Sequence, residues 1–289
     1  MNKVFLGDVL EIAADLEENS VDLIITSPPY FGLRTYKSNK KEEVGSEESM
    51  IEYVERLKKI FNGLKTLLKD SGSIFLNIGD TYASSTLRAG QTAPDGFERA
   101  KRNLTCKAKS NKYPKGIRRD FGKVRNKSLM GVPWRVALAM IDDGWILRND
   151  IIWAKRMLFD SGHFYGVHKP QPTVIDRFMD TKEYIFMFTK NDKYYFDKFY
   201  ADFPSVWSLK IQPGKTGHVA IFPEMLPALI ILAACPKGGL VLDPFAGSGT
   251  TLLAAKALGC QYIGIDICEE NVELMESRLE QQEEINVAI

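Results

Sequence analysis

Short apolar segments of strand type alternate with segments of helical periodicity along most of this chain. Residues 21–26 (VDLIIT), 73–78 (SIFLNI) and 183–189 (EYIFMFT) are rich in β-branched and aromatic side chains. Such runs are typical of strands that are covered on both faces. Residues 50–69 instead carry apolar side chains at spacings of three and four, which indicates an amphipathic helix. The alternation predicts an α/β fold with a mainly parallel sheet and helices on both faces.

The remaining elements follow from the same pattern. We expect strands at 4–5, 149–154, 240–242 and 261–265, and helices at about 133–143, 225–234, 250–258 and 269–282. Asp70-Ser71-Gly72 is expected to end the first helix, and Gly144 and Gly259 to end two later ones. Residues 155–182 and 191–217 are rich in aromatic residues, Pro and Gly, and are expected to be irregular.

Composition favours a cytoplasmic globular protein. Hydrophobic residues make up 45% of the 289 residues, which is ordinary for a globular chain. No apolar run reaches the roughly 18 residues of a membrane span, and the N-terminus lacks the apolar core of a signal peptide. The four cysteines show no metal-ligand spacing, so we interpret them as reduced thiols and predict no metal site.

The net charge of +1 hides a strongly basic segment. Residues 84–130 contain 13 Lys and Arg against three acidic residues, a net charge of +10, so the rest of the chain carries −9. A basic block in an otherwise acidic protein indicates a polyanionic partner such as nucleic acid. The alternative is a solvated loop, which is how charge runs usually behave.

The segment VLDPFAGSGTT has the form of a strand, a glycine-rich turn and a helix. Gly247 and Gly249 would allow a tight turn and a close approach of the backbone to a ligand. The N–H groups at the start of the helix would point toward that ligand. Asp266 ends the next strand, where an acid suits ribose hydroxyls, although it could instead cap a helix. The turn matches neither GxGxxG nor a P-loop, so a nucleoside-bearing cofactor other than a nucleoside triphosphate is favoured.

A second motif, TSPPY, ends the strand at 21–26. Two prolines fix the backbone and donate no hydrogen bond, so the corner is either a plain turn or a rigid element of a site. The pair of motifs resembles the S-adenosylmethionine-dependent DNA amino-methyltransferases: DPFAGSGTT and YIGID are similar to their motifs I and II, and TSPPY to their motif IV. The catalytic motif precedes the cofactor motif, as in the circularly permuted β group, so the resemblance implies a Rossmann-like methyltransferase fold with a target-recognition region.

The resemblance implies roles for individual residues. Ser27 and the carbonyl of Pro28 would accept hydrogen bonds from the target amino group, while Pro28 and Pro29 fix the corner and Tyr30 stacks on a flipped-out base. The segment HVAIFPEMLP resembles motif X, and FLGDVLE resembles motif III. The implied S-adenosylmethionine site comprises Asp8, Thr26, His218, Phe222, Asp243, Pro244, Phe245, Ala246, Gly247, Ser248, Gly249, Thr250 and Asp266.

Ser-Pro-Pro-Tyr is more typical of N4-cytosine enzymes, so the resemblance predicts a site-specific DNA cytosine-N4 methyltransferase of a restriction-modification system. An N6-adenine enzyme of the same fold is the nearest alternative. An RNA or protein-glutamine methyltransferase and a non-catalytic nucleotide-binding DNA module are more distant. The expected partners are double-stranded DNA and a cognate restriction endonuclease, with a monomer or a homodimer as the assembly.

The resemblance also divides the chain. Residues 1–83 would form the catalytic half, 84–130 a basic DNA-contacting insertion, 131–155 further core, 156–217 the target-recognition region and 218–289 the cofactor-binding half. The predicted DNA-binding residues are basic side chains of the insertion: Arg88, Lys101, Arg102, Lys107, Lys109, Lys112, Arg118, Arg119, Lys123 and Arg125.

Overall fold

A single eight-stranded sheet organises the part of the chain that the computed structural model describes, namely residues 2–31, 44–83, 124–155, 159–160, 163–164, 176–178, 180–209 and 223–281. The strand order is β1-β10-β9-β2-β3-β7-β4-β8. The bounds are β1 Asn2–Leu6, β2 Val21–Thr26, β3 Leu68–Ile78, β4 Ile146–Ala154, β7 Lys182–Thr189, β8 Val206–Ser208, β9 Leu240–Asp243 and β10 Gln261–Asp266. Two further strands, β5 (Phe159–Asp160) and β6 (His163–Phe164), pair only with each other.

The sheet is mainly parallel, as predicted. Neighbouring strands run parallel from β1 through β10, β9 and β2 to β3, and β4 is parallel to β8. Only β7 is reversed, since it pairs antiparallel with both β3 and β4. The carboxyl ends of the parallel strands therefore meet at one edge of the sheet, and the amino end of β7 lies at that same edge.

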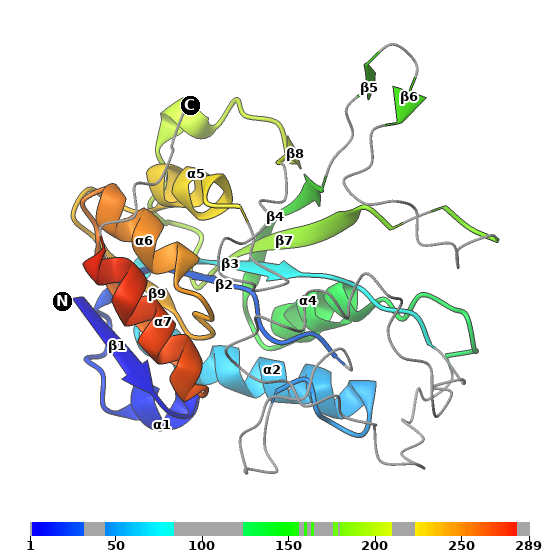
Figure 1. The fold of residues 1–289 in the computed structure, drawn as a ribbon, viewed down its shortest axis with the longest axis horizontal. Helices are drawn as coiled ribbons and strands as arrows, with labels where there is room; N and C mark the ends of the chain where they lie inside the picture. Colours follow the sequence, from blue (N-terminus) through cyan, green and yellow to red (C-terminus); the bar gives the residue numbers. More distant parts are fainter. Residues whose placement is uncertain are drawn as a thin grey trace.

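Helices cover both faces of the sheet (Figure 1). One hydrophobic core packs beneath α1 (Val9–Ala14), α2 (Met50–Lys65) and α4 (Val132–Asp142). A second core lies on the other face beneath α5 (Met225–Ala234), α6 (Thr250–Ala257) and α7 (Glu269–Glu280). The strand β2 is buried along its whole length, because it lies between these two layers. This arrangement confirms the predicted fold class.

Local sequence explains where the helices begin and end. Ser49 and Glu52 form a capping box at the start of α2, which satisfies two amide groups that the helix leaves free. Pro133 lies in the first turn of α4, where a missing N–H has no consequence. Gly144, which follows α4, has φ +83°, a left-handed conformation that glycine adopts without strain.

Three expectations about the elements are corrected. Asp70-Ser71-Gly72 does not end a helix but lies inside β3, because Leu68 already pairs with Val21 of β2. The helix α1 was not expected from the sequence. Residues 155–182 and 191–217 were expected to be irregular, but β5 and β6 lie in the first range. The short 3₁₀ helix η2 (Lys198–Tyr200) and β8 lie in the second, where β8 adds to the edge of β4.

Membrane-spanning helices, metal-ligand clusters and disulfide bonds are all absent from the part of the chain that the structure describes. Within the described residues, no helix is long and apolar enough to cross a membrane. Over the same ranges, no group of three or more His, Cys, Asp or Glu side chains is arranged to hold a metal ion. Cys235, Cys260 and Cys268, the cysteines in the described ranges, form no disulfide bond.

Candidate functional site

The two sequence motifs meet at the carboxyl edge of the sheet. TSPPY follows β2 and the glycine-rich turn follows β9, and these two strands are neighbours. The hydroxyl of Thr26 donates a 2.8 Å hydrogen bond to Oδ1 of Asp243, which joins residues 217 positions apart. Both side chains are buried. The contact ties the start of one motif to the start of the other.

Asp243 organises the first turn of the cofactor motif. Its Oδ2 accepts a 2.6 Å hydrogen bond from the hydroxyl of Thr251 in α6, and its Oδ1 also accepts one of 3.1 Å from the amide of Phe245. Burial nevertheless raises the pKa of Asp243 to about 6, because these hydrogen bonds only partly offset the loss of hydration. A carboxylate in this position would favour a cationic group nearby.

The glycine-rich turn has the predicted conformation. Gly247 has φ +54° and Gly249 has φ +80°, both in the left-handed region, and α6 begins at Thr250. The amide of Gly247 donates a 2.8 Å hydrogen bond to Oδ2 of Asp266 at the end of β10. The turn is thus fixed between two strand ends, with the amino end of a helix beside it.

Asp266 is a turn-stabilising residue in this structure and not the cap residue of α7, which is Cys268. Its Oδ1 accepts hydrogen bonds from the amide of Cys268 at 2.9 Å and the side chain of Asn271 at 3.1 Å. Burial raises its pKa. Its predicted contact with ribose hydroxyls stays a prediction.

Asp8 lies at the same edge, after β1. Its Oδ1 accepts a 2.8 Å hydrogen bond from the amide of Leu10 and caps α1. The adjacent amide of Gly7 donates to the backbone carbonyl of Asp266 at 2.9 Å. Asp8 is therefore close to the end of β10, as a shared site requires, while its predicted contact with adenine stays a prediction.

Contacts with residues distant in the sequence hold both the backbone and the tyrosine ring of the Ser-Pro-Pro-Tyr corner. The hydroxyl of Tyr53 in α2 donates a 2.9 Å hydrogen bond to the carbonyl of Pro29. A side chain at Gly79 would collide with the ring of Tyr30, because a Cβ there would lie 2.9 Å from Cε2 of that ring. The backbone of the corner is thus held by Tyr53 in α2, and its ring packs closely against Gly79, which follows β3.

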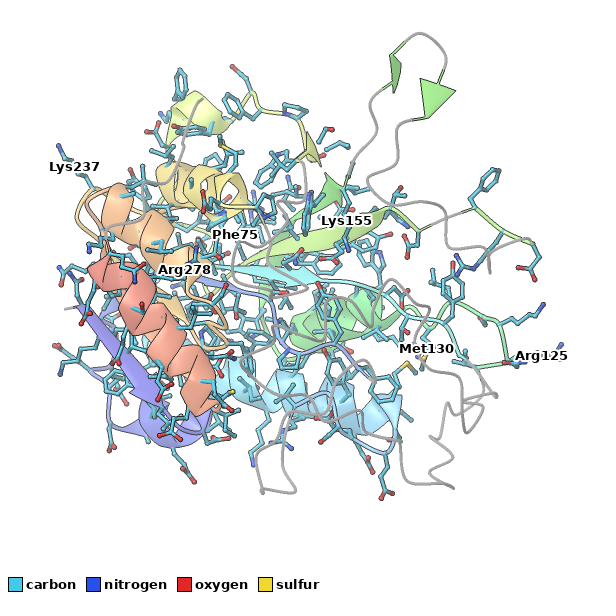
Figure 2. The ribbon with its side chains drawn as sticks, viewed as in Figure 1. Phe75, Arg125, Met130, Lys155, Lys237 and Arg278 are labelled. Atoms are coloured by element: carbon cyan, nitrogen blue, oxygen red, sulfur yellow. The ribbon has the colours of Figure 1, made fainter. Side chains whose placement is uncertain are left out.

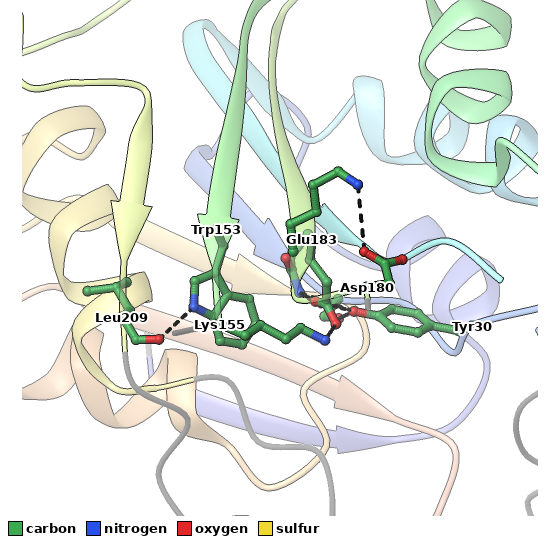
Figure 3. A network of polar contacts seen from close by, with 9 residues as sticks. Tyr30, Trp153, Lys155, Asp180, Glu183 and Leu209 are labelled. Carbon is green, nitrogen blue, oxygen red and sulfur yellow. Dashed lines mark hydrogen bonds and ion pairs between the residues drawn. The ribbon is translucent and has the colours of Figure 1, made fainter. Parts of the chain in front are cut away.

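A polar network surrounds the corner (Figure 3). The hydroxyl of Tyr30 donates a 2.6 Å hydrogen bond to Oε2 of Glu183, and Glu183 forms an ion pair with Lys155. The side-chain amide of Asn77 donates to the same Oε2 at 2.8 Å and lies 3.3 Å from Oγ of Ser27. Burial and then the charge of Glu183 raise the pKa of Tyr30 well above its usual value. Tyr30 therefore keeps its proton at neutral pH.

Sequence reasoning did not identify Asn77, Lys155, Glu183 or Thr251 as site residues. In the sequence, Asn77 and Glu183 stand out only as polar residues within or beside apolar strands. In the structure their exposed fractions are 3% and 6%. A buried polar side chain needs a partner, so each indicated an unseen contact. The identity of those partners required the strand order.

Several predicted residues lie outside the described part of the chain. These are His218 and Phe222 of the cofactor site, and all the predicted DNA-binding residues except Arg125. Arg125 is exposed and projects at the outer edge of the molecule (Figure 2). Pro244, Ala246 and Ser248, which were also predicted as cofactor residues, lie in the turn between β9 and α6.

The two ends of the basic insertion come together near the corner. Tyr82 and Leu129 form an antiparallel bridge, and the amide of Met130 donates to the carbonyl of Thr81 at 2.9 Å. The carboxylate of Asp80 accepts hydrogen bonds from the amides of Gly131 at 2.9 Å and Val132 at 3.0 Å. Asp80 follows β3 directly after Asn77-Ile78-Gly79, so the insertion leaves and rejoins the core beside the site.

The fold and site define a class of enzyme. A glycine-rich turn before a helix, with acids at the ends of β9 and β10, fits a nucleoside-bearing cofactor with a cationic group. The adjacent rigid corner with hydroxyl and carbonyl oxygens fits an amino group as the acceptor. Together they fit the class that the two motifs resemble, methyltransferases that act on an amino nitrogen.

Comparison with known proteins identifies the family. Residues 21–277 match the N6/N4 methyltransferase family model, which is described as DNA methylase. The chain belongs to this family. It is 35% identical to the type II methyltransferase M.SmaI of Serratia marcescens, over 96% of this chain and 90% of the relative. It is 36% identical to the type II methyltransferase M.Cfr9I of Citrobacter freundii, over 98% of this chain and 89% of that relative.

Solved structures confirm the fold. PvuII DNA methyltransferase (cytosine-N4-specific) superposes with a TM-score of 0.68 at 22% identity, over 96% of this chain and 86% of that one. A putative DNA modification methylase of Thermus thermophilus, complexed with S-adenosyl-L-methionine, gives a TM-score of 0.63 at 20% identity, over 98% and 96% of the chains. The protein is a DNA methyltransferase that uses S-adenosylmethionine, so the predicted cofactor and the predicted general activity, DNA methylation, are confirmed.

Proposed function

We propose that this DNA methyltransferase transfers the methyl group of S-adenosylmethionine to the exocyclic N4 of a cytosine, as the modification enzyme of a type II restriction-modification system. The observation that carries the proposal is the Thr26–Asp243 hydrogen bond, which joins the amino-group corner to the cofactor turn at neighbouring strand ends. A methyl group bound over the turn would therefore lie close to an amino group held at the corner.

The corner would activate the amino nitrogen. The lone pair of an exocyclic amine is delocalised into the base ring, so the nitrogen is a weak nucleophile. Acceptors placed on its two hydrogens favour a tetrahedral nitrogen with a free lone pair, and Ser27 Oγ and the Pro28 carbonyl are the proposed acceptors. The two prolines and the Tyr53–Pro29 hydrogen bond hold these oxygens in place before the substrate arrives, which is the basis of electrostatic preorganisation.

The target base would leave the duplex to reach the corner. An amino group inside the helix cannot be placed in line with a methyl donor, so base flipping is required. Tyr30 is half-buried beside Ser27, and its hydroxyl is held by Glu183. We assign its ring to the stacking contact with the flipped base.

DNA would be held by the basic insertion and the target-recognition region. The insertion begins and ends beside the catalytic corner, where Asp80 fixes its junction with α4. The guanidinium of Arg177, from the second region, lies 3.8 Å from the ring centroid of Tyr82 at the base of the insertion. The two regions therefore adjoin at this point, which supports a common DNA-facing surface. A cognate endonuclease would recognise the same DNA sequence.

Cytosine is the proposed base for two reasons. The corner begins with Ser27, as in the N4-cytosine enzymes that the motif resembles, and the superposed PvuII enzyme is described as cytosine-N4-specific. The test is to methylate unmodified DNA, digest it to nucleosides and separate them by mass spectrometry. N4-methylcytosine is the expected product, whereas N6-methyladenine alone would overturn the choice of base and retain the family.

Replacement of Ser27 tests the corner. Ser27→Ala removes one acceptor, so the single-turnover rate of methyl transfer should fall by about 10²-fold, as for loss of one preorganised hydrogen bond in other enzymes. The dissociation constant for S-adenosylmethionine, measured by calorimetry, should change by less than about twofold. Equal losses in both quantities would refute the assigned role of Ser27.

A further inference from the structure

We propose that Glu183 is a positioning residue for methyl transfer, because it fixes the direction of two hydroxyl hydrogens at the catalytic corner. In this arrangement Tyr30 donates to Glu183 and Ser27 donates to Tyr30, which leaves a lone pair of Ser27 Oγ for the amino group of the target base. The inference rests on the proposed function and adds to it a residue outside the Ser-Pro-Pro-Tyr motif.

Glu183 is a buried carboxylate that is fixed in place. It is 6% exposed and forms an ion pair with Lys155, whose ammonium lies 5.5 Å from the ring centroid of Trp153. The indole N–H of Trp153 is in turn held by the carbonyl of Leu209 at 3.0 Å (Figure 3). Both carboxylate oxygens of Glu183 face donors: Oε1 pairs with the ammonium of Lys155, and Oε2 accepts a 2.8 Å hydrogen bond from the side-chain amide of Asn77. Glu183 therefore acts as a hydrogen-bond acceptor.

The direction of the Tyr30 hydroxyl follows from this role of Glu183 as an acceptor. The distance between Tyr30 OH and Glu183 Oε2 is 2.6 Å, which is that of a hydrogen bond between a hydroxyl and a carboxylate. Since Oε2 of Glu183 is the acceptor, Tyr30 donates. The phenol has only one hydrogen, so in every other contact it can only accept.

The direction of the Ser27 hydroxyl follows in the same way. Ser27 Oγ lies 3.4 Å from Tyr30 OH, and Ser27 can only be the donor in that pair. The side-chain nitrogen of Asn77 lies 3.3 Å from Ser27 Oγ and donates to it. A serine hydroxyl has one hydrogen and two lone pairs, so one lone pair is left for a substrate N–H.

Loss of the carboxylate would release this arrangement. With a glutamine at position 183, the new side-chain N–H₂ can donate to Tyr30, so the phenol hydrogen becomes free to turn toward Ser27. The Ser27 hydrogen can then point at the target amino group, where two donors face each other. Glu183 thus acts on the substrate through Tyr30 and Ser27, and not by contact.

The test is single-turnover methyl transfer by Glu183→Gln with saturating DNA and S-adenosylmethionine. We expect the rate to fall at least about tenfold, the size of effect of losing a hydrogen bond to a charged group. Cofactor affinity and DNA affinity should stay within about twofold of wild type. A single-turnover rate within twofold of wild type would overturn the proposal.

Asp22→Asn is the matched control. Asp22 is also 6% exposed and pairs with a lysine, Lys69, at 2.9 Å, but it lies near the amino end of β2, away from the corner. The substitution removes a comparable buried charge, so its single-turnover rate should equal that of wild type. A loss as large as that of Glu183→Gln would mean that destabilisation alone explains both, and would also overturn the proposal.

Tyr30→Phe distinguishes loss of the Glu183–Tyr30–Ser27 chain of hydrogen bonds from loss of folding. It keeps the ring and removes only the hydroxyl, so it should slow methyl transfer even if Glu183→Gln does not fold. In the double variant the second substitution should add less than about twofold, because both break one chain of hydrogen bonds. If the two substitutions slowed methyl transfer independently, so that their effects on the rate multiplied in the double variant, a single chain of hydrogen bonds would be contradicted. Wild-type protein that forms no N4-methylcytosine would instead refute the proposed function, independently of these variants.

Discussion

The buried carboxyl of Asp243 makes the folding stability of this protein depend on pH. Burial raises its pKa to about 6 in the folded state, whereas an unfolded aspartate has a pKa of about 3.9. The folded state therefore binds this proton more tightly than the unfolded chain does. The stability that the group contributes is fully present below about pH 4 and is lost as the pH rises through about 6.

The size of the effect follows from the two pKa values. Each pH unit between them corresponds to about 1.4 kcal/mol, so the loss in free energy of unfolding comes to about 3 kcal/mol. Asp243→Asn does not titrate. The difference in free energy of unfolding between variant and wild type should therefore shift by about 3 kcal/mol in favour of the variant between about pH 4 and pH 8.

Urea denaturation at a series of pH values measures this difference, with the fluorescence of the buried Trp145 and Trp153 as the probe. Thr251→Val is a useful second variant, because its hydroxyl lowers the pKa of Asp243. Its loss should move the pH dependence to higher pH. A difference between Asp243→Asn and wild type that stays constant within about 1 kcal/mol over this range would refute the reasoning.

Other substitutions test the turn and the insertion. Gly249→Ala should lower the free energy of unfolding by about 1–3 kcal/mol and weaken cofactor binding, because φ is +80° and the added Cβ would lie 2.8 Å from Met275 Cγ. Gly238→Ala, with φ +76° and open space, is its control and should show only the backbone cost in thermal unfolding. Asp80→Ala should weaken DNA binding in a gel-shift assay without changing cofactor affinity. The substitution frees the amides of Gly131 and Val132, which Asp80 holds at the point where the basic insertion rejoins the core. Deletion of 95–125 should weaken DNA binding much more strongly, and unchanged affinity at physiological salt would contradict the role of the insertion.

Much of the fold could be predicted from local sequence. The strand at 21–26 and the helix at 225–234 have the predicted bounds, because a continuous apolar run and an apolar helix leave few alternatives. The stretch 66–72 was predicted wrongly. It extends a helical spacing of apolar residues, yet Leu68 pairs with Val21 of β2, and this pairing across the sheet outweighs local propensity.

Short segments of the chain are enough to define the class of site. Such segments contain the glycines of the turn, the rigid Ser-Pro-Pro-Tyr corner and the acids at strand ends. The kind of chemistry can therefore be inferred before the fold is known. Parallel strands then bring these segments to one edge of the sheet.

The surroundings of the corner, in contrast, depend on how the strands pair. Glu183 is the second residue of β7, and in a wholly parallel sheet it would lie at the edge opposite the site. Because β7 runs antiparallel to β3, its amino end meets the carboxyl end of β3, where Asn77 lies beside Tyr30 of the corner. The direction of a strand depends on pairing with distant neighbours, and no local pattern in EYIFMFT records it.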